Sequence, residues 1–145
     1  MNEYPSLTSL AYFAGLIDGE GYLQINKFKS INNKYPYEYR GTLRIAMCNK
    51  EVMDWLIQNI GGHYIQPKNL PSGREIWAWN MYSTKAADML EKALPFIVVK
   101  NAQAKIFIDF IRATAISNTG KKGLPIKNYL LREEFYLKMK EANKW

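Results

Sequence analysis

Two carboxylates, Asp18 and Glu20, lie among glycines where a helical pattern gives way to a strand pattern, in the stretch AYFAGLIDGEGYLQI (residues 11–25). A carboxylate at the C-terminal end of a helix opposes the helix dipole at a cost of roughly 0.3–1 kcal/mol, so Glu20 needs an explanation. Gly19 and Gly21 can adopt positive φ, which predicts a sharp turn with exposed backbone carbonyls. Carbonyl and carboxylate oxygens together suit magnesium or calcium, and a phosphate would complete the coordination. The alternative is a solvated acidic turn.

The composition excludes several other chemistries. The chain contains one cysteine, Cys48, and one histidine, His63, which excludes an internal disulfide and a Cys/His zinc site. A Ser-His-Asp triad would depend on His63 alone. The net charge of +7 favours a polyanionic partner, nucleic acid above all. The sequence has neither an apolar run of about 20 residues nor a signal-peptide pattern, so we expect an intracellular protein, in a prokaryotic cytoplasm or an organelle matrix.

A single domain, residues 1–145, is predicted to position these groups, because 48% hydrophobic residues suit a folded chain of this length. Periodicity predicts helices over 7–18, 49–62, 84–94, 101–116 and 128–143, and strands over 21–28, 39–47, 63–69 and 74–83. The repeated strand-strand-helix order predicts an α+β fold with a four-stranded antiparallel sheet and helices on one face. Trp77 and Trp79 share one face of their strand and are predicted to lie in the core.

The first predicted helix carries a stripe of small residues. Four positions spaced three or four apart share one helix face, namely Ala11, Ala14, Gly15 and Asp18. Such a stripe lets two helix backbones approach closely, and a single copy suits a two-fold axis. We therefore predict that these residues form a homodimer interface. The alternative is that the helix packs only against its own sheet.

The polar faces of the predicted strands carry side chains that can read bases. Gln and Asn pair with adenine and Arg with guanine, each contact being worth roughly 1–3 kcal/mol. The predicted DNA-binding residues are Gln24, Asn26, Arg40, Thr42 and Arg44 in the first hairpin, and Gln66, Lys68, Arg74 and Asn80 in the second. Lys121 and Lys122, in a glycine-flanked loop, are predicted to contact phosphates. The alternative is a solvated polar face.

The segment FAGLIDGEG (residues 13–21) closely resembles the motif for which the LAGLIDADG homing endonucleases are named, and it matches six of the nine positions. Asp18 and Glu20 occupy the two acidic positions of that motif. Three further segments, residues 43–62, 93–106 and 130–143, are similar to other parts of the family, so the resemblance covers nearly the whole chain. It implies a saddle-shaped antiparallel sheet straddling double-stranded DNA, with an αββαββα core. Because the chain holds one motif, it implies a homodimer on a long pseudo-palindromic site.

The resemblance also implies the roles of individual residues. Glu20 would be a catalytic, metal-binding carboxylate, with the carbonyl of Gly19 as a second ligand. Magnesium would support phosphodiester hydrolysis, and calcium would bind without supporting it. Lys100 matches a basic residue that stabilises charge on the phosphate or orders the attacking water. Asp18 would serve mainly the helix end and the interface.

One departure from the family lies near the end of the second strand, where many homodimeric relatives carry a water-ordering polar residue. Here the sequence is Met47-Cys48-Asn49. Met47 cannot order water, and Asn49 is equally suited to cap the following helix.

The function that these features imply is a site-specific, metal-dependent endodeoxyribonuclease that acts in intron homing. One alternative is a maturase, which would use the same fold to bind intron RNA and assist splicing. The other is a DNA-binding protein that has lost catalysis. The presence of both Glu20 and Lys100 favours the nuclease, because neither alternative requires them.

Overall fold

The structure has the predicted α+β class and the predicted order of elements. This computed structural model describes residues 4–31, 34–115 and 124–144, without the side chains of residues 67–68. The elements are α1 (Leu7–Glu20), β1 (Gly21–Lys29), β2 (Tyr37–Met47), α2 (Lys50–Asn59), β3 (His63–Asn69), β4 (Glu75–Tyr82), α3 (Ser83–Ala93), the 3-10 helix η1 (Leu94–Phe96), α4 (Asn101–Thr114) and α5 (Ile126–Ala142). Helix α1 is longer than predicted and includes Gly19 and Glu20. None of the helices in the described residues is long and apolar enough to cross a membrane.

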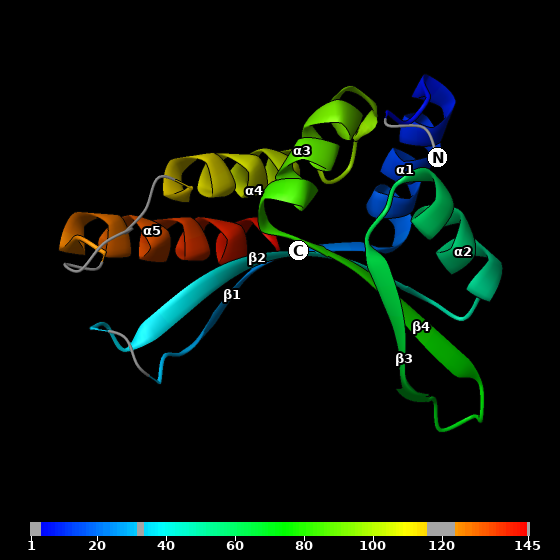
Figure 1. The fold of residues 1–145 in the computed structure, drawn as a ribbon, viewed down its shortest axis with the longest axis horizontal. Helices are drawn as coiled ribbons and strands as arrows, with labels where there is room; N and C mark the ends of the chain where they lie inside the picture. Colours follow the sequence, from blue (N-terminus) through cyan, green and yellow to red (C-terminus); the bar gives the residue numbers. More distant parts are fainter. Residues whose placement is uncertain (1–3, 32–33, 116–123, 145) are drawn as a thin grey trace.

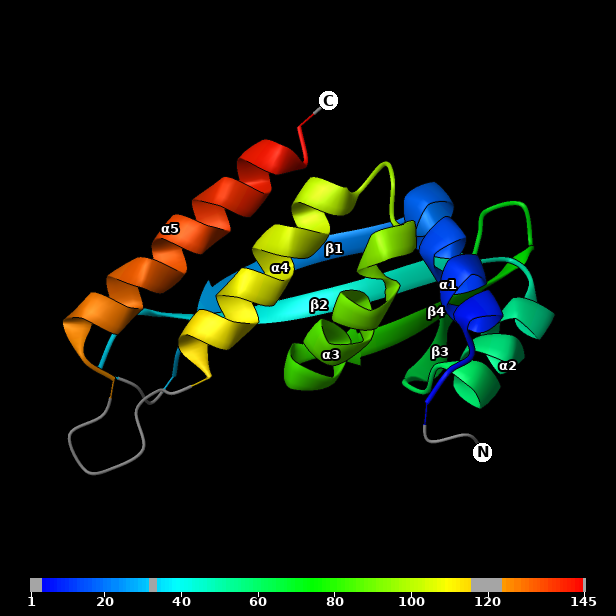
Figure 2. The same ribbon diagram turned by 90° about the horizontal axis from the view of Figure 1, so that it is seen from above.

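The four strands form one antiparallel sheet in the order β1-β2-β4-β3. Figure 1 shows that the sheet is arched, with α1, α3, α4 and α5 above its convex face. In the view from above, α3, α4 and α5 lie across the sheet next to one another (Figure 2). No element of the described residues covers the concave face (Figure 1). The predicted arrangement, with helices on one face, is therefore confirmed.

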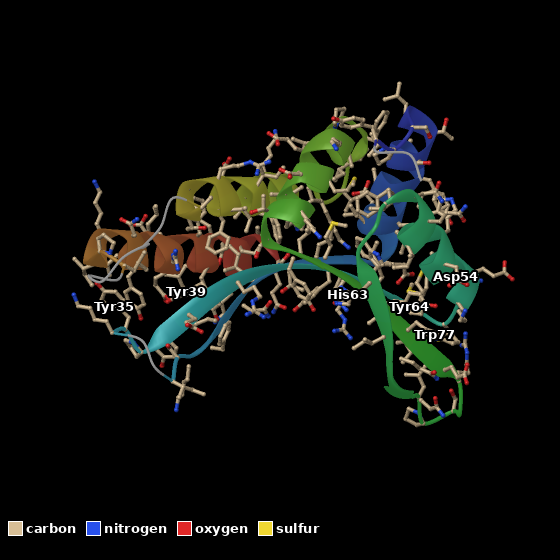
Figure 3. All side chains as sticks on the ribbon, in the orientation of Figure 1. Tyr35, Tyr39, Asp54, His63, Tyr64 and Trp77 are labelled. Atoms are coloured by element: carbon tan, nitrogen blue, oxygen red, sulfur yellow. The ribbon has the colours of Figure 1, made fainter. Side chains whose placement is uncertain are left out.

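The core lies between the convex face of the sheet and the helices. Leu23, Leu43 and Trp79 point to this side and are at most 2% exposed. The ring of Phe13 on α1 packs edge-on against Trp79, with 5.6 Å between ring centroids. Trp77 packs partly buried against the same core, and Figure 3 shows it on β4. The prediction that both tryptophans are core residues is therefore confirmed.

The junction between α1 and β1 differs from the expectation. Gly21 has φ −76° and ψ 151°, which is extended backbone, and the positive-φ glycines among the described residues are Gly61, Gly62 and Gly73. Gly19 and Gly21 therefore do not use the positive φ that glycine allows. Glycine is required at position 21 for another reason, because a Cβ there would lie 2.6 Å from the Cα and the carbonyl oxygen of Ile17. The chain leaves the helix through a close backbone approach.

Helix α5 is attached to the sheet largely by a polar and aromatic cluster. Lys27 Nζ lies 3.0 Å from the Glu133 carboxylate, and the Tyr39 hydroxyl donates to the same carboxylate. Lys27 Nζ also lies 4.5 Å from the ring centroid of Tyr37. Met139 is the one buried residue that α5 contributes within the described residues. Figure 3 shows Tyr39 between the sheet and α5, so this cluster takes the place of a larger apolar contact.

Candidate nucleic-acid interface and active site

The Glu20 side chain is exposed at the C-terminal end of α1. In the described part of the chain it has no hydrogen bond or ion pair. It lies at one end of a groove of about 500 Å³ on the concave face of the sheet. The other residues that line this groove are Tyr22, Gln24, Asn26, Thr42, Arg44, Ala46, Asn80 and Tyr82. A free carboxylate therefore faces a groove lined mainly by polar and aromatic side chains.

Lys100, at the start of α4, lies close to the residue that follows Glu20. Its ammonium group donates a hydrogen bond of 2.5 Å to the carbonyl oxygen of Gly21, 79 positions away in the sequence. The Lys100 side chain is half-buried there. The ammonium group of Lys100 therefore lies on the carbonyl of Gly21, the residue that follows Glu20.

Asp18 holds the segment that carries Lys100. Its carboxylate accepts hydrogen bonds from the backbone N–H groups of Val98, Val99 and Lys100, at 2.9, 3.0 and 3.0 Å. These amides precede α4, whose N-terminal end carries partial positive charge. A carboxylate that is unfavourable at the end of α1 is therefore favourable at the start of α4. These bonds give Asp18 a structural role within its own chain.

The predicted base-reading residues of the first hairpin share the concave face. Gln24 lies opposite Thr42, and Asn26 opposite Arg40, in the antiparallel pair of β1 and β2, so each pair projects to one side of the sheet. Thr42 Oγ1 donates to Asn26 Oδ1 at 2.6 Å, and Asn26 Nδ2 donates to Gln24 Oε1 at 3.0 Å. Arg44 lines the groove beside this network. The side chains are therefore partly ordered before any ligand binds.

The second hairpin agrees less well with the prediction. Asn80 lines the groove, but it is 3% exposed and its Nδ2 donates to the carbonyl oxygen of Ala78. Its neighbours on the sheet therefore leave Asn80 little surface for a base, and we do not include it among the proposed base contacts. Gln66 and Arg74 are exposed, as expected. Lys121 and Lys122 lie outside the described residues, and so does the side chain of Lys68.

Comparison with known proteins identifies the fold. No protein-family model and no curated protein sequence matches the chain, but solved structures do. The homing endonuclease I-CvuI, in complex with a DNA target in the presence of magnesium, superposes with a TM-score of 0.79 at 17% identity, over 95% of this chain and 83% of that one. The archaeal intron-encoded I-Vdi141I, complexed with DNA, gives 0.79 at 15% identity, over 94% and 85% of the two chains.

A third match is the LAGLIDADG homing endonuclease I-SmaMI bound to cleaved DNA, with a TM-score of 0.70 at 15% identity. The match covers 93% of this chain and 45% of I-SmaMI. The chain has the LAGLIDADG homing endonuclease fold. It spans 83% of the I-CvuI chain but less than half of I-SmaMI.

On helix α1 of this LAGLIDADG fold, not all residues of the predicted small-residue stripe are exposed. Ala14 is fully buried in the core of its own chain, so its assignment to a dimer interface is wrong. The physical reason is that α1 presents Ala14 to the sheet together with Phe13 and Ile17. Ala11 and Gly15 are exposed, and a Cβ added at Gly15 would meet no atom within 4 Å. The exposed part of the stripe is therefore narrower than predicted.

The LAGLIDADG fold also exposes apolar residues that sequence reasoning did not single out. Val98 is 78% exposed and Val99 56% exposed, and their amides bind the Asp18 carboxylate at the end of α1. They belong to the run IVVK, which follows Pro95 and Phe96. An apolar run that ends in lysine carries no sequence signal that distinguishes a surface segment from a buried one.

The residues at the unusual end of the second strand have structural roles in this fold. Asn49 is the N-cap of α2, since its Oδ1 accepts a hydrogen bond of 3.1 Å from the backbone N–H of Val52. Met47 packs against the hydrophobic core. The capping alternative for Asn49 is thus confirmed.

Proposed function

We propose that this chain is a site-specific double-strand DNA endonuclease of the homing type, which acts as a homodimer with a divalent metal ion. The observation that carries the proposal is the exposed Glu20 carboxylate at the polar concave groove, with the Lys100 ammonium on the adjacent peptide. The net charge of +7 and the fold shared with endonucleases solved on DNA support it.

The groups available for the metal are oxygens. Glu20 would supply a carboxylate and Gly19 a backbone carbonyl. In the described residues no three His, Cys, Asp or Glu side chains lie close enough together to hold a metal ion. This sparse set fits magnesium, which keeps several waters and binds through one or two carboxylates together with substrate phosphates. When bound, magnesium would polarise the scissile phosphate and lower the pKa of a coordinated water. We propose that calcium binds to the same oxygens without supporting cleavage.

Lys100 would act on the phosphate. Its ammonium is anchored to the Gly21 carbonyl and its backbone to Asp18, so its position is set before DNA binds. A fixed positive charge stabilises negative charge that develops on the phosphate as water attacks phosphorus and the bond to the leaving oxygen breaks. We assign Lys100 this electrostatic role.

Two copies of the chain would be needed to cut both DNA strands, because each copy offers one Glu20. The exposed Ala11 and Gly15 on α1 give the partner helix a flat surface. The exposed Val98 and Val99, whose amides bind Asp18 on the same helix, would add apolar contact. A two-fold axis along α1 would bring both Glu20 carboxylates near each other and would make the DNA site pseudo-palindromic.

The concave face would read the DNA. The proposed base contacts come from the ordered Gln24, Asn26 and Thr42 and from the cations Arg40 and Arg44, because amides pair with adenine and guanidinium groups with guanine. Gln66 and Arg74 would contact the DNA from the second hairpin, and Lys121 and Lys122 remain proposed phosphate contacts.

The test is a selection of cleaved sites from a random DNA library in magnesium, with Glu20→Gln as the matched control. The wild type should enrich a long, pseudo-palindromic sequence. Glu20→Gln removes one negative charge with little change in shape, so it should bind the selected DNA with an affinity similar to the wild type but should not cut it. Cleavage by Glu20→Gln would refute the assigned metal ligand. No enrichment by the wild type, together with stimulated splicing of a bound intron RNA, would favour the maturase.

A further inference from the structure

A second cavity lies away from the Glu20 groove, between β2, the start of α3, the end of α4, and α5. Its volume is about 260 Å³. It opens beside the part of β2 that extends past β4, since β4 pairs with β2 only from Thr42 to Met47. The polar residues that line it include Arg40, Ser83, Thr84 and Arg132. The Arg40 guanidinium itself lies over the Phe28 ring, 5.6 Å from its centroid, so one cation, Arg132, and two hydroxyl groups remain to face a cavity that the proposed cleavage reaction does not use.

Arg132, on α5, is in no ion pair within the described part of the chain. Its Nε is buried and has no hydrogen-bond partner, and no carboxylate within the described residues pairs with its guanidinium. Burial lowers the pKa of this guanidinium, yet arginine stays charged at any ordinary pH. The residue as a whole is half-exposed, so the buried Nε donor is the group that needs an explanation, and an anion in the cavity would supply its acceptor.

The carboxylates near this region are already engaged. Glu133, next to Arg132 in the sequence, binds Lys27 and Tyr39. Asp88 and Glu91 of α3 both bind Arg112, each at 2.7 Å. Within the described residues, the charge of Arg132 is therefore not balanced by a carboxylate.

The donors around the cavity indicate which ligand would do so. Ser83 and Thr84 stand at the start of α3, an 11-residue helix whose N-terminus has no side-chain cap. Hydroxyl groups, free helix amides and guanidinium groups together are the donors that bind tetrahedral oxyanions, and arginine binds phosphate oxygens through two parallel hydrogen bonds.

We propose that this cavity is a phosphate-binding site in which Arg132 is the principal ligand and Ser83 and Thr84 contribute further donors. The phosphate could come from two sources, a phosphodiester of DNA at the edge of the concave face or free inorganic phosphate. The DNA source rests on the proposed function, whereas the inorganic source does not.

The first experiment measures thermal unfolding of the full chain in inorganic phosphate against chloride at equal ionic strength, without DNA or magnesium. The variant is Arg132→Met. The control is Lys127→Met, which removes an exposed positive charge from the same helix. Phosphate should raise the Tm of the wild type and of Lys127→Met but not that of Arg132→Met. In chloride, Arg132→Met should unfold at the same temperature as the wild type or higher, because the uncompensated charge is gone.

The second experiment measures the salt dependence of DNA binding with catalysis blocked by calcium. If the ligand is a DNA phosphodiester, the slope of log K against log salt should be smaller for Arg132→Met by about 0.9, the value of one phosphate contact, and unchanged for Lys127→Met. An unchanged slope with a retained Tm response would assign the site to free phosphate.

The proposal is overturned if phosphate raises the Tm of Arg132→Met as much as that of the wild type while the slope is unchanged. It is also overturned if Arg132→Met unfolds well below the wild type in chloride, because Arg132 would then serve packing. Arg132→Lys, which keeps the charge and loses the fork geometry, should retain a weakened phosphate response. If phosphate does not raise the Tm of Arg132→Lys at all, the proposal is refuted independently of the Met variant.

Discussion

Asp18→Ala should destabilise the chain and displace Lys100. The substitution leaves three backbone amides, those of Val98, Val99 and Lys100, without their acceptor. A hydrogen bond to a charged group contributes about 1.5–3 kcal/mol, and water can replace it only where the amide is exposed. The bond to Lys100 is part-buried and the other two are exposed. We therefore count the first in full and the others at about 0.5 kcal/mol each, which gives a loss of about 2.5–4 kcal/mol.

The assay is urea unfolding at one fixed protein concentration, since a dimer's stability depends on concentration. Asp109→Ala on the exposed face of α4 is the control, because this aspartate has no hydrogen bond in the described residues and should change the unfolding free energy little. If Asp18→Ala unfolds within about 0.5 kcal/mol of the wild type, the range of ordinary surface substitutions, then the three bonds do not anchor this segment. Cleavage should fall further than stability alone predicts, because Lys100 is no longer held at Gly21.

Three further outcomes are expected. Gly15→Leu should shift the chain toward a monomer in sedimentation velocity, because the bulk would fill open space on α1 that the partner helix needs, and an unchanged dimer would count against this interface. Gly21→Ala should lower the free energy of unfolding in urea by about 1–3 kcal/mol, because its Cβ would meet the Ile17 backbone. Gly19→Ala, with open space around its Cβ, should be neutral or stabilising. Equal effects of the two substitutions would refute the argument from close backbone approach. Burial opposes ionisation of Glu133, but hydrogen bonds from Tyr39 and Lys27 outweigh it and hold its pKa below the ordinary 4.5. Its contribution to stability is then complete above pH 4.5 and is lost as the pH falls through the lower folded-state pKa. Glu133→Gln should therefore make the unfolding free energy depend less on pH in this acid range, as measured by circular dichroism.

Much of the fold could be predicted because its signals are local. Alternation placed Leu23, Leu43 and Trp79 on the covered face of the sheet, and glycine and capping residues marked where helices end. The motif at the end of the first helix identified Glu20. These features depend on residues within a few positions of one another, so a single sequence carries them.

The features that the sequence did not predict depend on distant partners. The bonds between Asp18 and residues 98–100 join positions about 80 apart, and no periodicity connects them. Ala14 and Gly15 are neighbours in the sequence, and only the packing of α1 on its sheet decides which of them is buried. Burial of Asn80 likewise depends on the strands on either side of β4. Each case needs the tertiary arrangement.

The hydrogen bonds among Thr42, Asn26 and Gln24 have a consequence for how DNA specificity changes. The Thr42 hydroxyl donates to the Asn26 oxygen, which turns the Asn26 amino group toward the Gln24 oxygen and leaves the Gln24 amino group pointing outward as a donor. The hydroxyl and the two amides thereby form one chain of hydrogen bonds whose direction changes only as a unit. Reversing that chain of hydrogen bonds would exchange donor for acceptor at its far end without altering Gln24. Base preferences at adjacent positions are then inherited together, so such an interface evolves by exchanging whole triplets of residues rather than by single steps.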